Sequence, residues 1–357
     1  MNRSRPTHGG NLTWAARQAG CASDAILDFS ASINPLGPPA SALTALQASL
    51  PSITAYPDPD CTALRLAIAR THQLAPAWIL PGNGAAELLT WASRDLAACA
   101  QTRYLVPGFA DYQRALSAFG AASQPDSLKL PDCLLPDFTR GDRPPQQCGL
   151  LLNNPHNPTG RLWSAAQLQP LLAQFALVVV DEAFMDFLPP EQQESLIAQI
   201  TTRQNLVILR SLTKFYSLPG LRLGYAIAHP DRLKRWQGWR DPWSVNSLAT
   251  AAGIAALRDT DFQAQTWHWL PTARQQLMAG LQALPGLTPL AGAANFLLVA
   301  TEYSSSALQA ILLKKHQILI RDCLSFPELG DRYFRVAVRT ETENQRLLSG
   351  LRAILAD

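Results

Sequence analysis

The sequence has few lysines, no close pairs of cysteines and no long hydrophobic run. Its 30 basic residues include only these lysines: Lys129, Lys214, Lys234, Lys314 and Lys315. A reaction that needs a primary amine therefore has few side chains to use. The net charge is only +3, and no run of Lys and Arg alternates with aromatic residues. We therefore expect neither nucleic acid nor an anionic membrane as a partner.

The six cysteines are spread over the chain, with no C-x-x-C motif and no histidine close to any pair of them. This spacing argues against a disulfide framework and against a zinc site, and it predicts a reduced, cytoplasmic protein without a metal. The first residues lack the hydrophobic segment of a signal peptide. No hydrophobic run approaches the roughly 18 residues of a membrane span, so we expect no membrane attachment.

Short runs rich in Val and Leu alternate with helical patterns through the first two thirds of the chain. This alternation is typical of a mostly parallel sheet that helices cover on both faces. After Ala228 the pattern changes to long helices and then to a smaller α+β set. The sequence predicts an α/β protein with an N-terminal arm at 1–40, a large domain at 41–245 and a small C-terminal domain at 246–357. We expect the arm to join the small domain.

The element boundaries follow from the hydrophobic periodicity and the turn residues. Strands are expected at 26–30, 103–106, 149–152, 176–180, 206–209, 224–228, 296–300, 318–321 and 334–338. Helices are expected at 41–50, 62–72, 85–100, 111–119, 164–175, 230–239, 245–284 with a break at 259, 304–316 and 342–355. A further short helix should begin after Asn11 and end at Gly20.

The segment from Leu209 to Tyr225 reads L-R-S-L-T-K-F-Y-S-L-P-G-L-R-L-G-Y. It places Lys214 beside the hydroxyls of Ser211 and Thr213 and shortly before Arg222. A lysine amine can form a Schiff base with a carbonyl cofactor. Hydroxyls together with an arginine can hold a phosphate. The spacing alone leaves a surface lysine after a turn as an alternative.

Three other predicted strand ends carry polar groups, which is where an open α/β sheet binds its ligand. After P-G-N-G, a helix would offer the N–H groups of Ala85 and Ala86 to a phosphate. N-N-P-H-N-P-T-G holds Asn157 between two Asn-Pro turns. V-V-V-D-E-A-F ends a hydrophobic strand at Asp181, whose carboxylate needs a cationic or hydrogen-bonding partner. A metal at Asp181 is disfavoured, because no histidine or third carboxylate follows at ligand spacing.

Together these motifs resemble the pyridoxal 5'-phosphate (PLP) enzymes of the aspartate-aminotransferase fold, PLP fold type I, over nearly the whole chain. The resemblance implies that Lys214 binds the cofactor covalently, that Asp181 pairs with the pyridine nitrogen and that Asn157 donates to the 3'-oxygen. Lys214 and Asp181 would be catalytic. The remaining implied cofactor contacts are Ser211, Thr213, Arg222, Ala85 and Ala86 at the phosphate, Phe109 stacked on the ring, and Tyr56 contributed across a homodimer interface.

Motifs near both ends of the chain narrow the resemblance. H-G-G-N, D-F-S-A-S-I-N-P-L-G-P, I-L-I-R-D-C and Y-F-R-V-A-V-R-T are similar to the L-threonine-O-3-phosphate decarboxylases of cobalamin biosynthesis, a family close to histidinol-phosphate aminotransferases. The resemblance implies a small phosphorylated amino acid as substrate, with Arg321 and Arg335 at strand ends. The implied substrate contacts are His8, Gly9, Ser32, Asn157, Arg321 and Arg335.

The implied reaction is decarboxylation of O-phospho-L-threonine to (R)-1-aminopropan-2-yl phosphate. Histidinol-phosphate aminotransferase is the alternative activity. Phe184 and the H-G-G arm argue against it, because aminotransferases of this fold commonly carry a tyrosine bonded to the 3'-oxygen where this chain has Phe184. A non-catalytic PLP-binding regulator is the second alternative, but such proteins usually carry a DNA-binding module, and residues 1–40 are too few and not basic enough for one.

Overall fold

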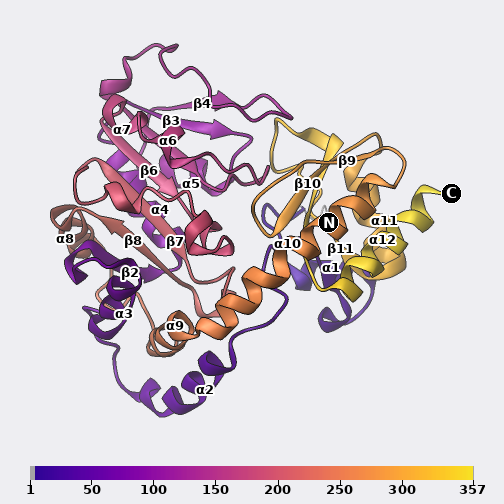
Figure 1. Ribbon diagram of the computed structural model, residues 1–357, viewed down its shortest axis with the longest axis horizontal. Coiled ribbons are helices and arrows are strands. Elements are labelled where there is room, and N and C mark those ends of the chain that lie inside the picture. The colour runs from indigo at the N-terminus through magenta and orange to yellow at the C-terminus, as the bar shows by residue number, and fades with distance from the viewer. Residues whose placement is uncertain (1–4, 357) are drawn as a thin grey trace.

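A seven-stranded sheet forms the centre of the larger of two lobes in the computed structural model, which describes residues 5–356 (Figure 1). The strand order is β2-β8-β7-β6-β5-β3-β4. The strands are β2 (Ile79–Asn83), β3 (Gln101–Val106), β4 (Ser123–Ser127), β5 (Cys148–Asn153), β6 (Leu177–Asp181), β7 (Leu206–Ser211) and β8 (Leu223–Ala228). β8 is antiparallel to both of its neighbours, and all the other neighbouring pairs are parallel. The predicted mostly parallel sheet is therefore confirmed.

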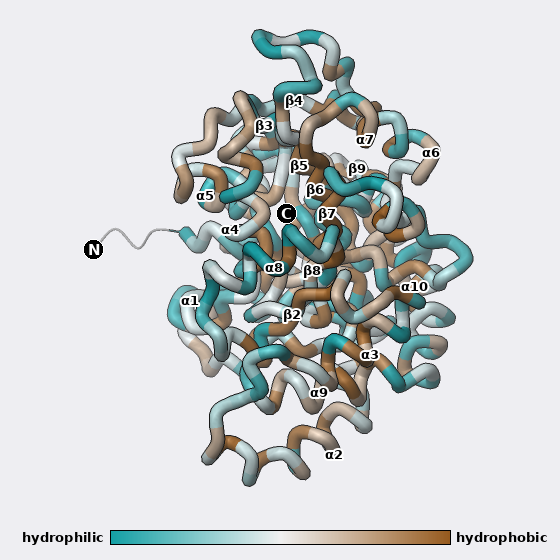
Figure 2. Tube along the Cα trace, turned by 90° about the vertical axis from the view of Figure 1, so that its left-hand side faces the viewer, coloured by the Kyte–Doolittle hydropathy of each residue, from teal (hydrophilic) through white to brown (hydrophobic). Residues whose placement is uncertain are grey.

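Both faces of this sheet are covered. Consecutive side chains of a strand point to opposite faces, so the two faces can be told apart by the clusters that their side chains join. In β6, Leu177 and Val179 belong to one hydrophobic cluster, whereas Val178 and Val180 belong to another. The first face packs against α4 (Ala85–Leu96) and α8 (Pro230–Trp239), and the second against α3 (Thr62–His72) and α9 (Ser247–Arg258). Figure 2 shows the resulting hydrophobic stretches along β5, β6 and β7. The other helices of this lobe are α2 (Ala40–Ser49), α5 (Asp111–Ser117), α6 (Ala165–Leu168) and α7 (Leu171–Gln174).

The smaller lobe contains C-terminal and N-terminal segments, and α10 (Thr260–Gln282) leads into it from the larger lobe (Figure 1). Its antiparallel sheet has the order β12-β10-β9. The elements are β9 (Leu287–Pro289), β10 (Phe296–Thr301), α11 (Ser305–His316), β12 (Tyr333–Ala337) and α12 (Glu341–Leu355). In addition, β1 (Leu27–Asp28) pairs in parallel with β11 (Ile318–Leu319), and α1 (Leu12–Ala19) contacts α11. The N-terminal segment thus lies against this lobe, while the division into domains at residues 40 and 245 stays a prediction.

Several element boundaries differ from the expectation for physical reasons. The structure adds β4 at the edge of the large sheet, where the sequence S-Q-P-D-S has no hydrophobic pattern and where a proline is tolerated. The helix expected at 164–175 is two short helices, which are separated at Gln169 and Pro170, because proline lacks the N–H that a continuous helix needs. The strand expected at 318–321 ends at Leu319.

Among the described residues, no helix is both long enough and hydrophobic enough to cross a membrane.

A buried cation joins two neighbouring strand ends of the large sheet. Arg210, in β7, has no exposed surface and forms ion pairs with Glu182, at 2.8 Å, and with Asp186. Glu182 follows directly after β6 and also accepts hydrogen bonds from the hydroxyl of Ser195 and the amide of Leu196. The ion pairs therefore connect the end of β6 with the end of β7, and both are places where polar motifs occur in the sequence.

We expect Arg210→Met to lower the free energy of unfolding by about 3–5 kcal/mol, because it leaves two buried carboxylates without their cation. Urea denaturation followed by circular dichroism measures this loss. Arg140→Ala is the control, because Arg140 is 88% exposed in its ion pair with Asp137, and it should leave the urea midpoint unchanged. A loss in the Arg210 variant no larger than in this control would show that the buried ion pairs do not stabilise the sheet.

Candidate active site

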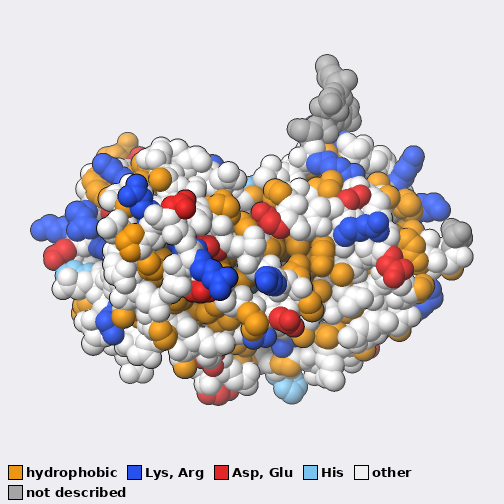
Figure 3. All heavy atoms as spheres, turned by 90° about the horizontal axis from the view of Figure 1, so that it is seen from above, with side chains coloured by type: hydrophobic (Ala, Val, Ile, Leu, Met, Phe, Trp, Pro, Cys, Tyr) orange, Lys and Arg blue, Asp and Glu red, His pale blue; other side chains and the backbone are white. Residues whose placement is uncertain are grey.

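The carboxyl ends of β5, β6 and β7 border a cavity of about 570 Å³ whose wall contains residues of both lobes. Carboxyl ends of parallel strands meet at one edge of a sheet, where ligands of open α/β folds bind. Asn153 ends β5 and Asp181 ends β6, and Lys214 follows shortly after β7. Seen from above, the outline of the molecule is indented between the two lobes (Figure 3).

The structure brings most of the predicted site residues together. Those that line the cavity are His8, Gly9, Ser32, Ala85, Ala86, Phe109, Asn157, Asp181, Thr213, Lys214, Arg222, Arg321 and Arg335. Ser211 is buried beside it, and its Oγ accepts a hydrogen bond from Nζ of Lys214 at 3.2 Å. Tyr56 is not in the wall: it is 79% exposed, and its ring stacks on Trp243 with centroids 4.5 Å apart.

Lys214 is half-buried among charged side chains of the cavity wall. Burial lowers the pKa of its amine from 10.5 to about 8; the carboxylate of Asp181 opposes this shift, and the cations of Arg222 and Arg335 add to it. A lowered pKa increases the fraction of unprotonated amine near neutral pH, and this is the nucleophilic form. The site therefore activates its lysine through burial.

Asp181 is held in a defined orientation by two donors. Its Oδ2 accepts a hydrogen bond from the hydroxyl of Tyr112 at 2.9 Å, and its Oδ1 accepts one from the amide of Ala183 at 3.0 Å. Burial raises the pKa of Asp181, whereas Lys214 and both of these hydrogen bonds favour the ionised form. Tyr112 was missed in the sequence, although it lies in the same P-G-F-A-D-Y motif as Phe109.

The start of α4 and the segment after β7 hold a group of donors that could bind a phosphate. The first N–H groups of α4 have no acceptor within the helix, and Ala85 and Ala86, at this start, line the cavity. Gly84 has a φ of +78°, and a Cβ there would lie 2.4 Å from Nη2 of Arg222. Only glycine therefore lets this guanidinium lie so close to the helix start. The hydroxyls of Ser211 and Thr213 are 2.8 Å apart nearby, so amides, hydroxyls and a cation converge as a phosphate requires.

Two buried arginines enter the cavity from the smaller lobe. Arg321 and Arg335 are joined by an antiparallel bridge, with their backbones exchanging hydrogen bonds of 3.0 and 2.8 Å. Residues paired in this way place their side chains on the same face. Contrary to the expectation, Arg335 lies inside β12 rather than at its end. Burial lowers the pKa of Arg335 to about 10, so it stays cationic at neutral pH.

Contacts around Arg335 connect this cationic pair to the sheet side of the cavity. Its guanidinium donates to Oδ1 of Asn157 and to the carbonyl of Ser30. The amide N–H groups of Asn157 are therefore the part of this side chain that can donate to a ligand. On the arm, the ring of His8 lies 5.7 Å from that of Phe109, and burial lowers the pKa of His8.

Three polar atoms of cavity-lining residues lack a protein partner. Oδ1 of Asn153, Oγ of Ser32 and Nε of Arg335 are buried, with no hydrogen bond within the described part of the chain. Leaving such atoms unpaired is costly, so a polar ligand is expected to pair with them. Ser325 and Phe326 also line the cavity and were missed, because the loop that holds them has no distinctive sequence pattern. Within residues 5–356, no group of His, Cys, Asp or Glu is arranged to hold a metal ion.

The family model for aminotransferase class I and II matches residues 24–351. The chain belongs to this family. Membership confirms the predicted fold class, PLP as the cofactor and the prediction that the chain is a PLP-dependent enzyme. Membership alone does not separate decarboxylases from aminotransferases, because relatives with both names are similar to the chain.

Individual relatives confirm the predicted similarity to the decarboxylases. The chain is 41% identical to threonine-phosphate decarboxylase of Salmonella typhimurium, over 98% of this chain and 96% of that protein. It is 32% identical to histidinol-phosphate aminotransferase of Methylobacillus flagellatus, over 96% and 93%. The structure of L-threonine-O-3-phosphate decarboxylase from Porphyromonas gingivalis covers 92% of this chain and 99% of its own, with a TM-score of 0.82 and 25% identity.

The residues of the cavity fit PLP chemically. Lys214 would hold its aldehyde carbon, Asp181 its pyridine nitrogen and the donors around Gly84 its phosphate. The carboxylate ends β6 and the amine follows β7, while the phosphate donors come from the start of α4, the segment after β7 and Arg222. This arrangement matches a cofactor that has these three groups at different positions. These residue roles stay a prediction.

We expect the rate at which PLP attaches covalently to the cofactor-free protein to rise with pH and to level off above about pH 8, because the unprotonated Lys214 attacks and its pKa is about 8. Stopped-flow absorbance of the bound cofactor measures this rate. Lys214→Arg keeps the positive charge but should bind no PLP covalently. A rate that keeps rising towards the ordinary lysine pKa of 10.5, or covalent binding by the arginine variant, would contradict this assignment.

Proposed function

We propose that this chain decarboxylates O-phospho-L-threonine to (R)-1-aminopropan-2-yl phosphate, the linker of the cobalamin nucleotide loop, in the cytoplasm. The observation that carries this proposal is the bridged pair Arg321 and Arg335, which lines the same cavity as Lys214. The substrate has two anionic groups, a phosphate and a carboxylate, and arginine binds both well. The free state of all six cysteines is in keeping with a reducing compartment.

The chain's own residues would act by binding, orienting and transferring a proton. Bound PLP supplies an electron sink for the pair released at the substrate α-carbon. Arg321, Arg335 and His8 would bind the phosphate and the carboxylate, and this orientation selects the bond to the carboxylate as the one that breaks. Lys214 would then return a proton to the α-carbon, a role that a pKa near 8 suits at neutral pH. Asp181, fixed by Tyr112, would hold the pyridine nitrogen throughout.

Histidinol-phosphate aminotransferase is the second candidate, because a relative with that name is 32% identical to the chain. Phe184 argues against it. Its ring lines the cavity, is buried and packs edge-on against Phe296 with centroids 5.0 Å apart, and it has no hydroxyl of its own. A phenylalanine cannot donate a hydrogen bond to the 3'-oxygen of the cofactor, as the tyrosine of aminotransferases does. The electron distribution of the bound cofactor would therefore differ from that in aminotransferases.

We expect the purified protein with PLP to release carbon dioxide from O-phospho-L-threonine while the cofactor stays in its PLP form. Gas release and the cofactor absorbance are followed together, and unphosphorylated L-threonine is the control, which should react far more slowly because remote phosphate binding contributes to the rate. Accumulation of pyridoxamine phosphate without carbon dioxide, with L-histidinol phosphate as the better substrate, would favour the aminotransferase.

We further propose a homodimer in which Tyr56 reaches the active site of the partner subunit. Leu50, Ile53 and Tyr56 are more than half exposed, and Trp243, stacked on Tyr56, is 46% exposed. An exposed hydrophobic group of this kind is typical of an interface between proteins. The position of Tyr56 outside the cavity of its own chain supports a contribution to another copy.

Subunit mixing tests this arrangement. Lys214→Ala and Tyr56→Ala should each lose most activity alone, whereas their co-expression should restore up to about a quarter of wild-type activity, because random pairing gives mixed dimers with one complete site. Activity of the purified mixture measures this recovery, and sedimentation reports the oligomeric state. No recovery in verified mixed dimers would show that Tyr56 acts in its own subunit or not at all.

A further inference from the structure

The N-terminal arm, residues 5–11, crosses the substrate side of the cavity and carries His8. Thr7, His8, Gly9 and Gly10 line the cavity, whereas Arg5 lies outside its wall. Arg5 therefore cannot act on the substrate by contact. Arg5 nevertheless contacts Asp322, which directly follows the cavity residue Arg321 in the chain.

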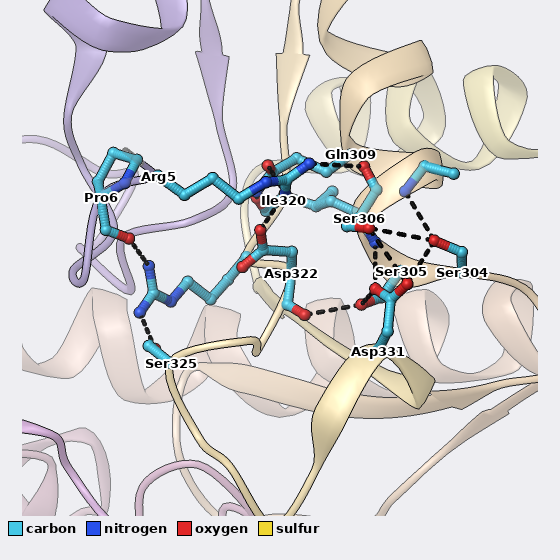
Figure 4. Close-up of polar contacts among 12 residues, drawn as sticks. Arg5, Pro6, Ser304, Ser305, Ser306, Gln309, Ile320, Asp322, Ser325 and Asp331 are labelled. Carbon is cyan, nitrogen blue, oxygen red and sulfur yellow. Dashed lines mark hydrogen bonds and ion pairs between the residues drawn. The ribbon is translucent and has the colours of Figure 1, made fainter. Parts of the chain in front are cut away.

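Arg5 is fixed to the smaller lobe through its guanidinium (Figure 4). It forms an ion pair with Asp322, and Nη1 also donates to Oε1 of Gln309 at 3.1 Å. Asp322 is 5% exposed, and its backbone carbonyl lies 2.7 Å from the hydroxyl of Ser305 in the first turn of α11. The carboxylate that binds Arg5 thus belongs to a buried residue whose backbone is hydrogen-bonded to α11, whereas the arginine itself is 40% exposed.

The residue before Asp322 holds the next part of the arm. Arg321 donates to the carbonyls of Pro6 and Thr7 and to the hydroxyl of Ser325. Two consecutive residues thus bind the arm in different ways, since Asp322 pairs with a side chain and Arg321 with the backbone. Any anion that Arg321 binds must share this guanidinium with the arm.

The arm is also fixed after His8. The amide of Gly10 donates to Oγ of Ser30 at 2.8 Å, and Ser30 in turn donates to Asp28. A Cβ on Gly9 would lie 2.2 Å from the carbonyl oxygen of Ser30. The backbone of the arm at Gly9 is therefore so close to the backbone of Ser30 that a side chain would not fit between them. His8 therefore lies between two anchors, and Arg5 with Asp322 forms the outer one.

We propose that Arg5 and Asp322 are positioning residues for the substrate: their ion pair holds the arm so that His8 and Arg321 face the anionic groups of the ligand. The pair has a second effect, because Arg5 neutralises a carboxylate that directly follows Arg321 in the chain. Without Arg5, that buried negative charge would weaken the attraction of the site for a phosphate. The inference rests on the proposed function in one respect, the identity of the phosphorylated substrate.

Arg5→Ala in the PLP-loaded enzyme should raise KM for O-phospho-L-threonine on the order of tenfold, the effect of losing one charge-assisted contact. The kcat should change by no more than about twofold, since no group at the reacting atoms is altered. Without substrate, amide hydrogen exchange of residues 6–12 should become faster. Arg5→Lys should restore KM, whereas adding Asp322→Asn to Arg5→Ala should cost less than the sum of the two single effects.

Arg235→Ala on α8 is the matched control, because Arg235 is 53% exposed and also lies near an aspartate with little exposure, Asp95 at 10%. This variant should change neither KM nor exchange of the arm. Unchanged exchange in Arg5→Ala would overturn the inference, and so would faster exchange with an unchanged KM. If the wild-type enzyme does not accept O-phospho-L-threonine, the proposed function fails. In that case amide hydrogen exchange of the wild type and of Arg5→Ala still tests whether Arg5 anchors the arm. The KM values of the two proteins are then measured with L-histidinol phosphate as the substrate.

Discussion

The ion pairs of Arg210 with Glu182 and Asp186 are the interaction on which the site depends most. Glu182 directly follows Asp181, and Arg210 directly precedes Ser211, so one buried cation connects the strand ends that carry the proposed cofactor residues. A fully buried arginine is tolerable only with both carboxylates in place. The strand ends that carry Asp181 and Ser211 are therefore held together by groups that do not themselves line the cavity.

The two sides of the cavity come from different parts of the fold. The large sheet supplies the lysine, the carboxylate and the phosphate donors, all from segments at strand ends. The arm and the smaller lobe supply His8, Arg321 and Arg335. Under the proposed function, the first group would hold the cofactor and the second would bind the substrate. Family membership shows the cofactor, and the proposed choice of reaction rests on the arm and the two arginines.

Strand positions and cofactor residues could be predicted because they depend on local patterns. The run Leu177–Asp181 is hydrophobic at every position before its carboxylate, as a strand buried on both faces must be. β4 could not be predicted, because an edge strand is stabilised by pairing with β3 and needs no hydrophobic pattern. Tyr112 was missed for a similar reason, since its hydrogen bond to Asp181 joins residues 69 positions apart.

The sequence by itself determined the fold class and the family, and it predicted Lys214 as the lysine that would take the cofactor, because each of these depends on motifs whose residues lie close together in the chain. Only the tertiary structure decided that Arg321 and Arg335 share a face, that Arg335 binds Asn157 and that Asp322 anchors Arg5. Charged side chains from distant segments meet where the folded backbone places them, and no local periodicity records such pairs. The substrate side of this site consists largely of contacts of that kind.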